Sequence, residues 1–399
     1  MSASHRTHIY CREMRMKLEQ EHENVLRGED GEAMALAMKT LVAYGEAFGA
    51  KRLVPIKSAH LTGSFGISPF SAYYQILGRL ADEGAKFKVP TTLNPRPGRD
   101  LNIINRLIFG RQKRLESCYS ALGITPNYSC VCYFNANVPA LGDRIAWAES
   151  SAVQYANSAL GARTNRNSIL IDVCGAVTGL TPEFGYLLDE NRRGRVLVRI
   201  KIDRMDPPAL GYIIGKTVVD RVPVIEHYPF SREELKNMGG AMAASGGVAL
   251  FHVEGVTPEA PDMKTVFDGS PKETITITQA DLDAMRSKNT EKIRHVIFGC
   301  PQMTADEAAA LAERFAGKKT ALPVWFCMIP DEMKQFEQTG LFRKAREAGV
   351  QVYDHCPLAS LPVRKKSHTV LTNSGKLYYY LENTEYGATD DCLRACGVL

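Results

Sequence analysis

Apolar residues recur at helical spacing along residues 145–160, inside the run IAWAESSAVQYANSALGARTNR that ends at Arg166. The run contains no proline, and its first glycine is Gly161, so it predicts one small-residue helix that stops at this glycine. Two arginines, a hydroxyl and an amide follow it directly, at Arg163, Thr164, Asn165 and Arg166. The pattern is typical either of an anion-binding turn at the end of a close-packed helix or of a buried helix with a polar rim.

Strands and helices alternate most clearly in the last hundred residues. Short apolar runs at 295–298, 323–328 and 350–353 are separated by helical patterns at 305–315 and 331–348, the second broken near Gly340. Such alternation predicts a parallel sheet with helices on its faces, and therefore an α/β fold. The same reasoning predicts further strands at 51–56, 87–93, 128–134, 195–202, 222–225, 248–252 and 274–277, and further helices at 13–27, 32–48, 71–82, 102–122, 231–238 and 279–285.

Polar side chains follow two of the predicted strands in the first half of the chain. Residues 57–70, KSAHLTGSFGISPF, form a loop rich in glycine and hydroxyl groups that carries Lys57, Ser58 and His60. The strand at 87–93 ends in threonines followed by Asn94. Binding groups in α/β proteins lie in such loops at the carboxyl ends of strands. We expect these residues to contribute to a site, although His60 taken alone also fits an ordinary surface loop.

Three of the ten cysteines lie at the ends of separate predicted strands. Cys300 and Cys356 each precede a proline after a strand of the C-terminal sheet, and Cys130 lies in the strand predicted at 128–134. Three thiolates can hold iron–sulfur clusters or zinc and leave one position open for substrate. The alternative is three unrelated buried cysteines. The pairs Cys130/Cys132 and Cys392/Cys396 lack the spacing of a zinc ribbon.

Composition and missing motifs exclude several classes of protein. The 399 residues carry a net charge of +5 without a long basic tract, so we expect no nucleic-acid partner. No apolar run reaches the roughly 18 residues that span a bilayer, and the first residues lack a secretory signal, so we expect a cytoplasmic protein with reduced cysteines. Motifs for nucleotide cofactors, serine hydrolases and zinc proteases are also missing. A hydro-lyase or isomerase with a metal cluster fits best, and a non-catalytic, metal-free α/β subunit is the alternative.

A set of motifs spread over about residues 45–360 resembles the aconitase X family, a branch of the aconitase superfamily. The motifs are AHLTG, TLNP, SCVCYFNANVPALG, IAWAESSAVQYANSALGARTNR, GLTPEFGYLLDENR, HVEGVTPEA, FGCP and DHCP. The resemblance is to the large, catalytic subunit, and it implies aconitase-like three-layer α/β/α subdomains around a central cleft. We expect an N-terminal helical segment at 1–44, a first α/β lobe at 45–205, a middle section at 206–290 and a C-terminal subdomain at 291–399.

The resemblance implies an iron–sulfur cluster, 4Fe-4S or 2Fe-2S, held by Cys130, Cys300 and Cys356. Cys132 replaces a proline of the family pattern and is a rival ligand to Cys130. The iron that no cysteine holds would bind the leaving hydroxyl group of a small hydroxy acid. The resemblance implies that His60 or Glu149 donates the proton, with Lys57 and Ser58 beside His60. It implies that Arg163 and Arg166 bind the substrate carboxylate. The residues implied to orient the substrate are Asn94, Ser150, Thr164 and Asn165.

The resemblance also implies a partner and a choice of substrates. The family's catalytic serine lies on a swivelling domain that we expect on a separate small subunit, because about 100 further residues would be needed to hold it. Family activities include dehydration of cis-3-hydroxy-L-proline and of 5-phosphomevalonate. The sequence favours the hydroxyproline type, with 5-phosphomevalonate or another hydroxy acid as the alternative.

Overall fold

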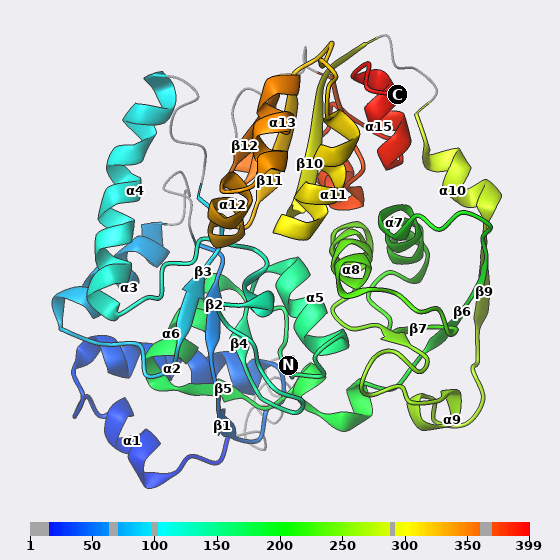
Figure 1. The fold of residues 1–399 in the computed structure, drawn as a ribbon. Helices are drawn as coiled ribbons and strands as arrows, with labels where there is room; N and C mark the ends of the chain where they lie inside the picture. The colour runs from blue at the N-terminus through cyan, green and yellow to red at the C-terminus, as the bar shows by residue number, and fades with distance from the viewer. Residues whose placement is uncertain (1–15, 64–70, 97–102, 288–291, 360–368) are drawn as a thin grey trace, which may run out of the picture.

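Four β-sheets organise the part of the chain that the computed structural model describes (Figure 1). This part comprises residues 16–63, 71–96, 103–287, 292–359 and 369–399. Three of the sheets are parallel throughout, as the alternation of strands and helices predicts. Residues 64–70 of the glycine-rich loop and residues 13–15 of the first predicted helix lie outside the described part.

The N-terminal lobe contains the small sheet that positions His60. Strand β2 (Ala59–Leu61) lies between β3 (Thr91–Leu93) and β4 (Ala146–Trp147), and all three are parallel. Strands β1 (Leu53–Pro55) and β5 (Leu180–Pro182) form a separate antiparallel pair. The helices of the lobe are α1 (Gln20–Leu26), α2 (Glu32–Ala47), α3 (Ser71–Asp82), α4 (Ile103–Leu122), α5 (Ser150–Ser158) and α6 (Ile169–Thr178).

The middle section is built on a four-stranded sheet in the order β8-β7-β6-β9. Its strands are β6 (Val196–Lys201), β7 (Pro223–Ile225), β8 (His252–Val253) and β9 (Thr274–Thr278). Its helices are α7 (Pro207–Val218), α8 (Arg232–Gly246), α9 (Met263–Val266) and α10 (Gln279–Met285). Strand β6 pairs with β7 and β9, so it belongs with this sheet although the sequence analysis placed residues 195–202 at the end of the first lobe.

The C-terminal sheet has five strands in the order β12-β11-β10-β13-β14. They are β10 (Ile293–Met303), β11 (Val324–Met328), β12 (Val350–Tyr353), β13 (Thr369–Thr372) and β14 (Thr384–Tyr386). The helices are α11 (Ala305–Phe315), α12 (Pro330–Glu337), α13 (Gly340–Ala348), α14 (Gly375–Tyr380) and α15 (Thr389–Ala395). The sequence pattern predicted α11 and β12 with these bounds and the break before Gly340.

Helices α5 and α8 lie side by side near the centre of the molecule (Figure 1). Small residues allow α8 to approach its neighbours closely. A Cβ atom at Gly211 of α7 would lie 2.0 Å from the backbone oxygen of Met238, and one at Gly239 would lie 1.8 Å from Gln154 of α5. Residues 239–246, which lie beyond the helix predicted at 231–238, continue α8, and their small side chains form part of its contact surface with other helices.

Two predictions for the segment from 128 to 160 are wrong. The helix predicted from residue 145 begins at Ser150, because Ala146 and Trp147 pair with β2 as strand β4. The strand predicted at 128–134 is a loop followed by a 3-10 helix, Cys132–Phe134. Tyr128 has a φ of 44°, which no strand accommodates. Both segments are so apolar that their local pattern does not distinguish buried loop, strand and helix.

Within the described residues, the structure has no helix that is long and apolar enough to cross a membrane.

Candidate active site

His60 is fixed at the centre of the three-stranded sheet. In the strand register it lies beside Thr92 on one side and Trp147 on the other. Its Nδ1 is 2.8 Å from the Thr92 hydroxyl oxygen, and its Nε2 is 2.9 Å from Oδ1 of Asn94. Because an amide oxygen only accepts, Nε2 carries the proton in this arrangement. Complete burial lowers the pKa of His60 to about 4 although Glu149 acts in the opposite direction, so the ring is neutral near pH 7.

Glu149 and Lys376 form a buried ion pair, and each side chain is only 6% exposed. Glu149 caps helix α5: its Oε2 accepts from the backbone N–H of Ala152 at 2.6 Å and from the Ser151 hydroxyl at 2.6 Å. The Lys376 ammonium group on α14 binds Oε1 of Glu149 and donates to Ser151 at 3.0 Å. Both charges are therefore satisfied by hydrogen bonds away from water, which such burial requires.

For both Glu149 and Lys376, the ion pair and its hydrogen bonds affect the pKa more than burial does. Burial by itself would raise the pKa of Glu149, but Lys376, Ser151 and Ala152 together lower it. Burial by itself would lower the pKa of Lys376, but the negative charge of Glu149 raises it. The pair is therefore ionised at neutral pH. The sequence analysis named Glu149 and missed Lys376, which no local pattern distinguishes from a surface lysine of a short helix.

Cys130, Cys300 and Cys356 come from three segments that are far apart in the sequence. Cys130 and Cys300 are within electrostatic range of each other, of Cys356 and of Lys376. Cys130 and Cys300 are buried free thiols, 9% and 8% exposed, and Cys356 is half-buried. Burial raises the pKa of Cys130 to about 12 and that of Cys300 well above its usual value. Cys356 follows β12, as expected from the strand ends, whereas Cys300 lies inside β10 and Cys130 lies in a loop.

The donor set suits a cluster better than a single ion. Among the described residues, no group of three or more His, Cys, Asp or Glu side chains is placed to hold one metal ion. Three thiols from separate segments of the chain are the kind of ligand that iron–sulfur clusters use, and the Glu149 carboxylate lies within electrostatic range of two of them. Cys130, Cys300 and Cys356 would hold such a cluster through their sulfur atoms. The residues therefore fit a cluster by their chemistry.

Two further cysteines lie close to this group. Cys132 is buried in the 3-10 helix and lies against the Thr92 hydroxyl, beside His60. Cys327 on β11 is buried and within electrostatic range of Cys130 and Cys356. Nothing in its sequence context separated Cys327 from the other buried cysteines. Its proximity comes from the register of β11 beside β10 and β12.

The turn that follows α5 is largely bound to other parts of the chain. Arg163 forms ion pairs with Asp189 at 2.5 Å and Glu259 at 3.7 Å. Asn165 donates to the backbone oxygen of Phe184 and accepts from the backbone of Tyr186. These contacts secure the turn to residues 184–189. The Arg163 guanidinium and the Asn165 amide, which the sequence predicts to bind an anion, therefore bind other residues of the chain in this structure.

The remaining candidates divide between buried and exposed positions. The hydroxyl oxygen of Thr164 accepts from the backbone N–H of Trp147 at 3.2 Å, and that of Ser58 accepts from its indole N–H at 3.3 Å. Ser150 is half-buried, and its hydroxyl lies 3.4 Å from Glu149. Lys57 and Arg166 are exposed. The structure therefore brings His60, Asn94, Glu149, Ser150 and the three cysteines into one region.

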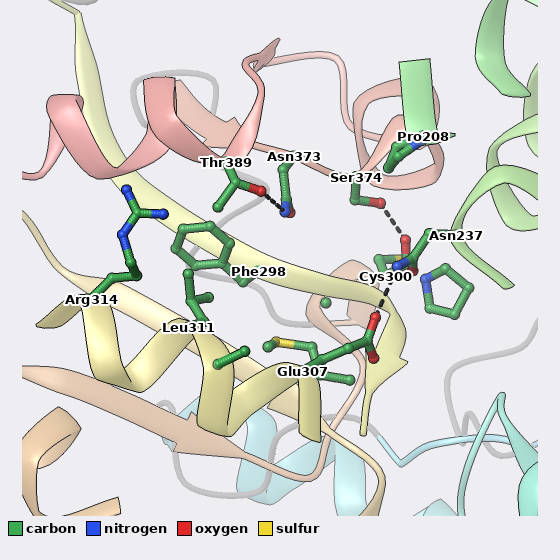
Figure 2. A pocket seen from close by; sticks show the side chains of 14 residues that line it. Pro208, Asn237, Phe298, Cys300, Glu307, Leu311, Arg314, Asn373, Ser374 and Thr389 are labelled. Atoms are coloured by element: carbon green, nitrogen blue, oxygen red, sulfur yellow. Dashed lines mark hydrogen bonds between the residues drawn. The ribbon is translucent and has the colours of Figure 1, made fainter. Parts of the chain in front are cut away.

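A pocket of about 360 Å³ lies beside the backbone of Cys300 (Figure 2). It opens between α8, α11 and the start of α14, and the Ser374 hydroxyl on its wall binds the backbone oxygen of Cys300. Asn237 donates to Glu307 across it at 2.8 Å. Glu149, Lys376 and Cys130 do not line this pocket, so it adjoins the cysteine group instead of containing it.

Parallel sheets with helices on their faces define the class, an α/β protein whose candidate site places buried thiols beside a buried ion pair. Three successive models of the aconitase X family, its first, second and third domains, match residues 15–190, 194–287 and 293–397. The chain belongs to the aconitase X family. Its members are dehydratases, and this chain is a hydro-lyase of that type.

Individual relatives agree with this assignment. The chain is 37% identical to the phosphomevalonate dehydratase large subunit of Thermococcus kodakarensis, over 92% of this chain and 95% of that protein. It is 35% identical to the Methanosarcina mazei protein of the same name, over 95% and 96%. It is 34% identical to the cis-3-hydroxy-L-proline dehydratase of Pseudomonas aeruginosa, over 89% of this chain and 65% of that enzyme.

A solved structure confirms the fold. The holo-form of Thermococcus kodakaraensis aconitase X matches with a TM-score of 0.87 and 34% identity, over 96% of this chain and all of that one. The predictions of an α/β fold, of the family and of hydro-lyase activity are thus confirmed.

Proposed function

We propose that the chain is the large subunit of an iron–sulfur hydro-lyase that dehydrates 5-phosphomevalonate. The observation that carries the cluster is the convergence of Cys130, Cys300 and Cys356 beside the Glu149–Lys376 pair. The substrate rests on the relatives: large subunits named phosphomevalonate dehydratase are 34–37% identical in four archaea. The cis-3-hydroxy-L-proline type, which the sequence analysis favoured, is the second candidate because two such enzymes are 34% and 29% identical.

The cluster would be held by Cys130, Cys300 and Cys356, and when bound it supplies a Lewis acid for the leaving hydroxyl group. Three cysteine ligands would leave one position free for substrate on either a 4Fe-4S or a 2Fe-2S cluster. Lys376 offsets the negative charge of the thiolates in a region from which water is excluded. We place this chemistry in the cytoplasm, because the thiols must stay reduced.

The chain's own residues would bind and orient the substrate. His60 holds the oxygen of Asn94, so the half-buried Asn94 amide presents its N–H groups in a fixed direction. Its amide and the Ser150 hydroxyl suit a carboxylate. Because the His60 ring is neutral, it acts as a hydrogen-bond donor and not as a source of strong acid. Glu149, held ionised by Lys376, is the alternative group for moving a proton.

The substrate carboxylate would meet the end of the turn after α5. Arg166 is exposed there and is free to turn toward a ligand, whereas Arg163 is held by Asp189 and Glu259 and would brace the turn. Thr164 and Asn165 fix the backbone of the same turn. Lys57 and Ser58 precede His60 and would position its strand.

A small subunit would complete the enzyme. The name "large subunit" that several relatives carry supports this partner. We propose that it brings the swivelling domain with the catalytic serine that abstracts the proton. The group on the partner and the cluster on this chain would then act on opposite sides of one substrate.

The substrate assignment is tested by competition between the two candidates. The chain, co-expressed with its small subunit and purified without oxygen, is expected to dehydrate 5-phosphomevalonate with a kcat/KM at least ~100-fold above that for cis-3-hydroxy-L-proline. A site built for a phosphate or a ring nitrogen leaves buried polar groups unpaired with the wrong substrate. The chain alone, with its cluster in place, should show little turnover.

The opposite preference would assign the hydroxyproline reaction instead. Full activity of the isolated chain with its cluster bound would show that the small subunit is not required.

A further inference from the structure

Gln302 lies two residues after Cys300, inside strand β10, and only 1% of it is exposed. It sits where the register between β10 and β11 shifts, between Phe298 and Met303. A buried glutamine must pair both ends of its amide or lose free energy. Its partners therefore show what the position is used for.

The amide of Gln302 joins the loops of two other cysteines. Its Oε1 accepts from the backbone N–H of Cys130 at 3.3 Å, and its Nε2 donates to the backbone oxygen of Asp354 at 2.9 Å. Asp354 precedes Cys356 by two residues. If the amide were flipped, its NH2 group would face the N–H of Cys130 and its oxygen would face the backbone oxygen of Asp354. These two partners therefore determine the orientation of the amide. One side chain thus connects all three cysteine segments.

The backbone of Gln302 adds a contact to sulfur and an anchor to helix α8. Its N–H donates to Sγ of Cys130 at 3.4 Å. Its carbonyl oxygen accepts from Lys236 at 3.0 Å, and this fully buried lysine pairs with Glu307 at 2.6 Å. Glu307 also belongs to the capping box of α11. Gln302 is therefore also anchored to helices α8 and α11, besides the loops of the cysteines.

We propose that Gln302 is a positioning residue that fixes the loops of Cys130 and Cys356 relative to Cys300, and so sets how firmly the cysteines retain their cluster. The inference rests on the proposed function, since it takes these three thiols as the ligands. Groups behind metal ligands orient them, and hydrogen bonds to thiolate sulfur tune a cluster. Neither Leu nor Glu reproduces the pair of contacts: Leu offers none, and Glu cannot donate to Asp354.

The test compares cluster retention in Gln302→Leu and Gln302→Glu with the wild-type chain, all purified without oxygen. We expect both variants to lose iron to a chelator ~10–100-fold faster than wild type. A shifted midpoint potential of the remaining cluster is expected as well. The matched control is Gln154→Leu: Gln154 is also a fully buried glutamine, and its Nε2 donates a hydrogen bond to Met242 Sδ on α8 and not to a cysteine segment. This control should keep the wild-type rate.

Each outcome decides the inference. Wild-type iron retention and potential in both variants would overturn it, as would loss of fold in both by circular dichroism, because the role would then be in the fold. If only Gln302→Leu fails to fold, Gln302→Glu decides alone. A wild-type chain that binds no iron would instead overturn the proposed function.

Discussion

Replacing Cys300 by serine is expected to abolish the visible absorbance of the cluster and to lower dehydratase activity more than ~100-fold. Loss of a residue that only orients a metal ligand usually has a smaller effect, about 10–100-fold. Cys300 is central to the thiol group, because its sulfur is within electrostatic range of Cys130, Cys356 and Lys376. A serine hydroxyl is nearly isosteric but is a poor ligand for iron, so the fold should persist while the cluster is lost. Iron and sulfide analysis and visible spectra measure the effect.

Variants of three other cysteines show whether loss of the cluster is specific to the proposed ligands. Cys174→Ala is the control, because Cys174 is an equally buried thiol on α6 in the core of the N-terminal lobe. It should keep a normal cluster. Cys130→Ser should behave as Cys300→Ser, whereas Cys132→Ser should retain the spectrum because Cys132 lies against Thr92. Survival of a normal cluster in Cys300→Ser would contradict the ligand assignment, and loss in Cys132→Ser but not in Cys130→Ser would exchange those two residues.

Replacing Lys376 by methionine is expected to destabilise the protein by about 3–5 kcal/mol at neutral pH, the usual cost of removing one partner of a buried ion pair. The change leaves Glu149 buried with hydrogen bonds but without a compensating charge. In the variant, burial would raise the pKa of Glu149, because Lys376 no longer lowers it. A raised pKa in the folded state means that the variant is most stable at low pH and loses stability as pH rises through it. Urea unfolding at pH 5 and pH 8 measures this difference.

The double variant Glu149→Gln/Lys376→Met removes both charges and should recover most of the stability lost by Lys376→Met alone, without restoring activity. Arg314→Met is the matched control, because the Arg314–Asp390 pair has side chains that are 42% and 56% exposed. Surface pairs contribute about 0–1 kcal/mol, so this variant should unfold nearly as wild type. Equal losses of stability in Lys376→Met and Arg314→Met would contradict the stabilising role of the buried pair, as would equal stability of Lys376→Met at pH 5 and pH 8.

Local pattern was enough to predict the elements whose amphipathic period is regular. Helix α11 has the predicted bounds because it buries one regular face, with Ala308, Leu311 and Phe315. Strand β12 has the predicted bounds as a short run that pairs in parallel with β11. The segment from 128 to 160 was mispredicted because Val131, Cys132, Tyr133, Ala146 and Trp147 are all fully buried. A segment buried on every side has no period, so only the pairing of β4 with β2 determines its form.

Site residues could be predicted from the sequence where they directly follow a strand, but contacts between side chains that are distant in the sequence could not. Asn94 directly follows β3 and Cys356 follows β12, as the rule that parallel strands end at one edge predicts. His60 and Cys300 instead lie inside strands, and Cys130 lies in a loop. Lys376 pairs with Glu149 across 227 residues of sequence, and Gln302 meets Cys130 across 172. Such pairs come from tertiary packing alone. Arg163 looked like an anion ligand because two acids that neutralise it, Asp189 and Glu259, lie in distant loops.

The most direct test is dehydratase activity measured against iron and sulfide content in the wild-type chain, purified without oxygen together with its small subunit. Activity toward 5-phosphomevalonate should rise in proportion to bound iron and sulfide. It should fall to background when a chelator removes them and return on reconstitution. Full activity in iron-free protein would contradict the account, because the three converging cysteines would then have no part in the reaction.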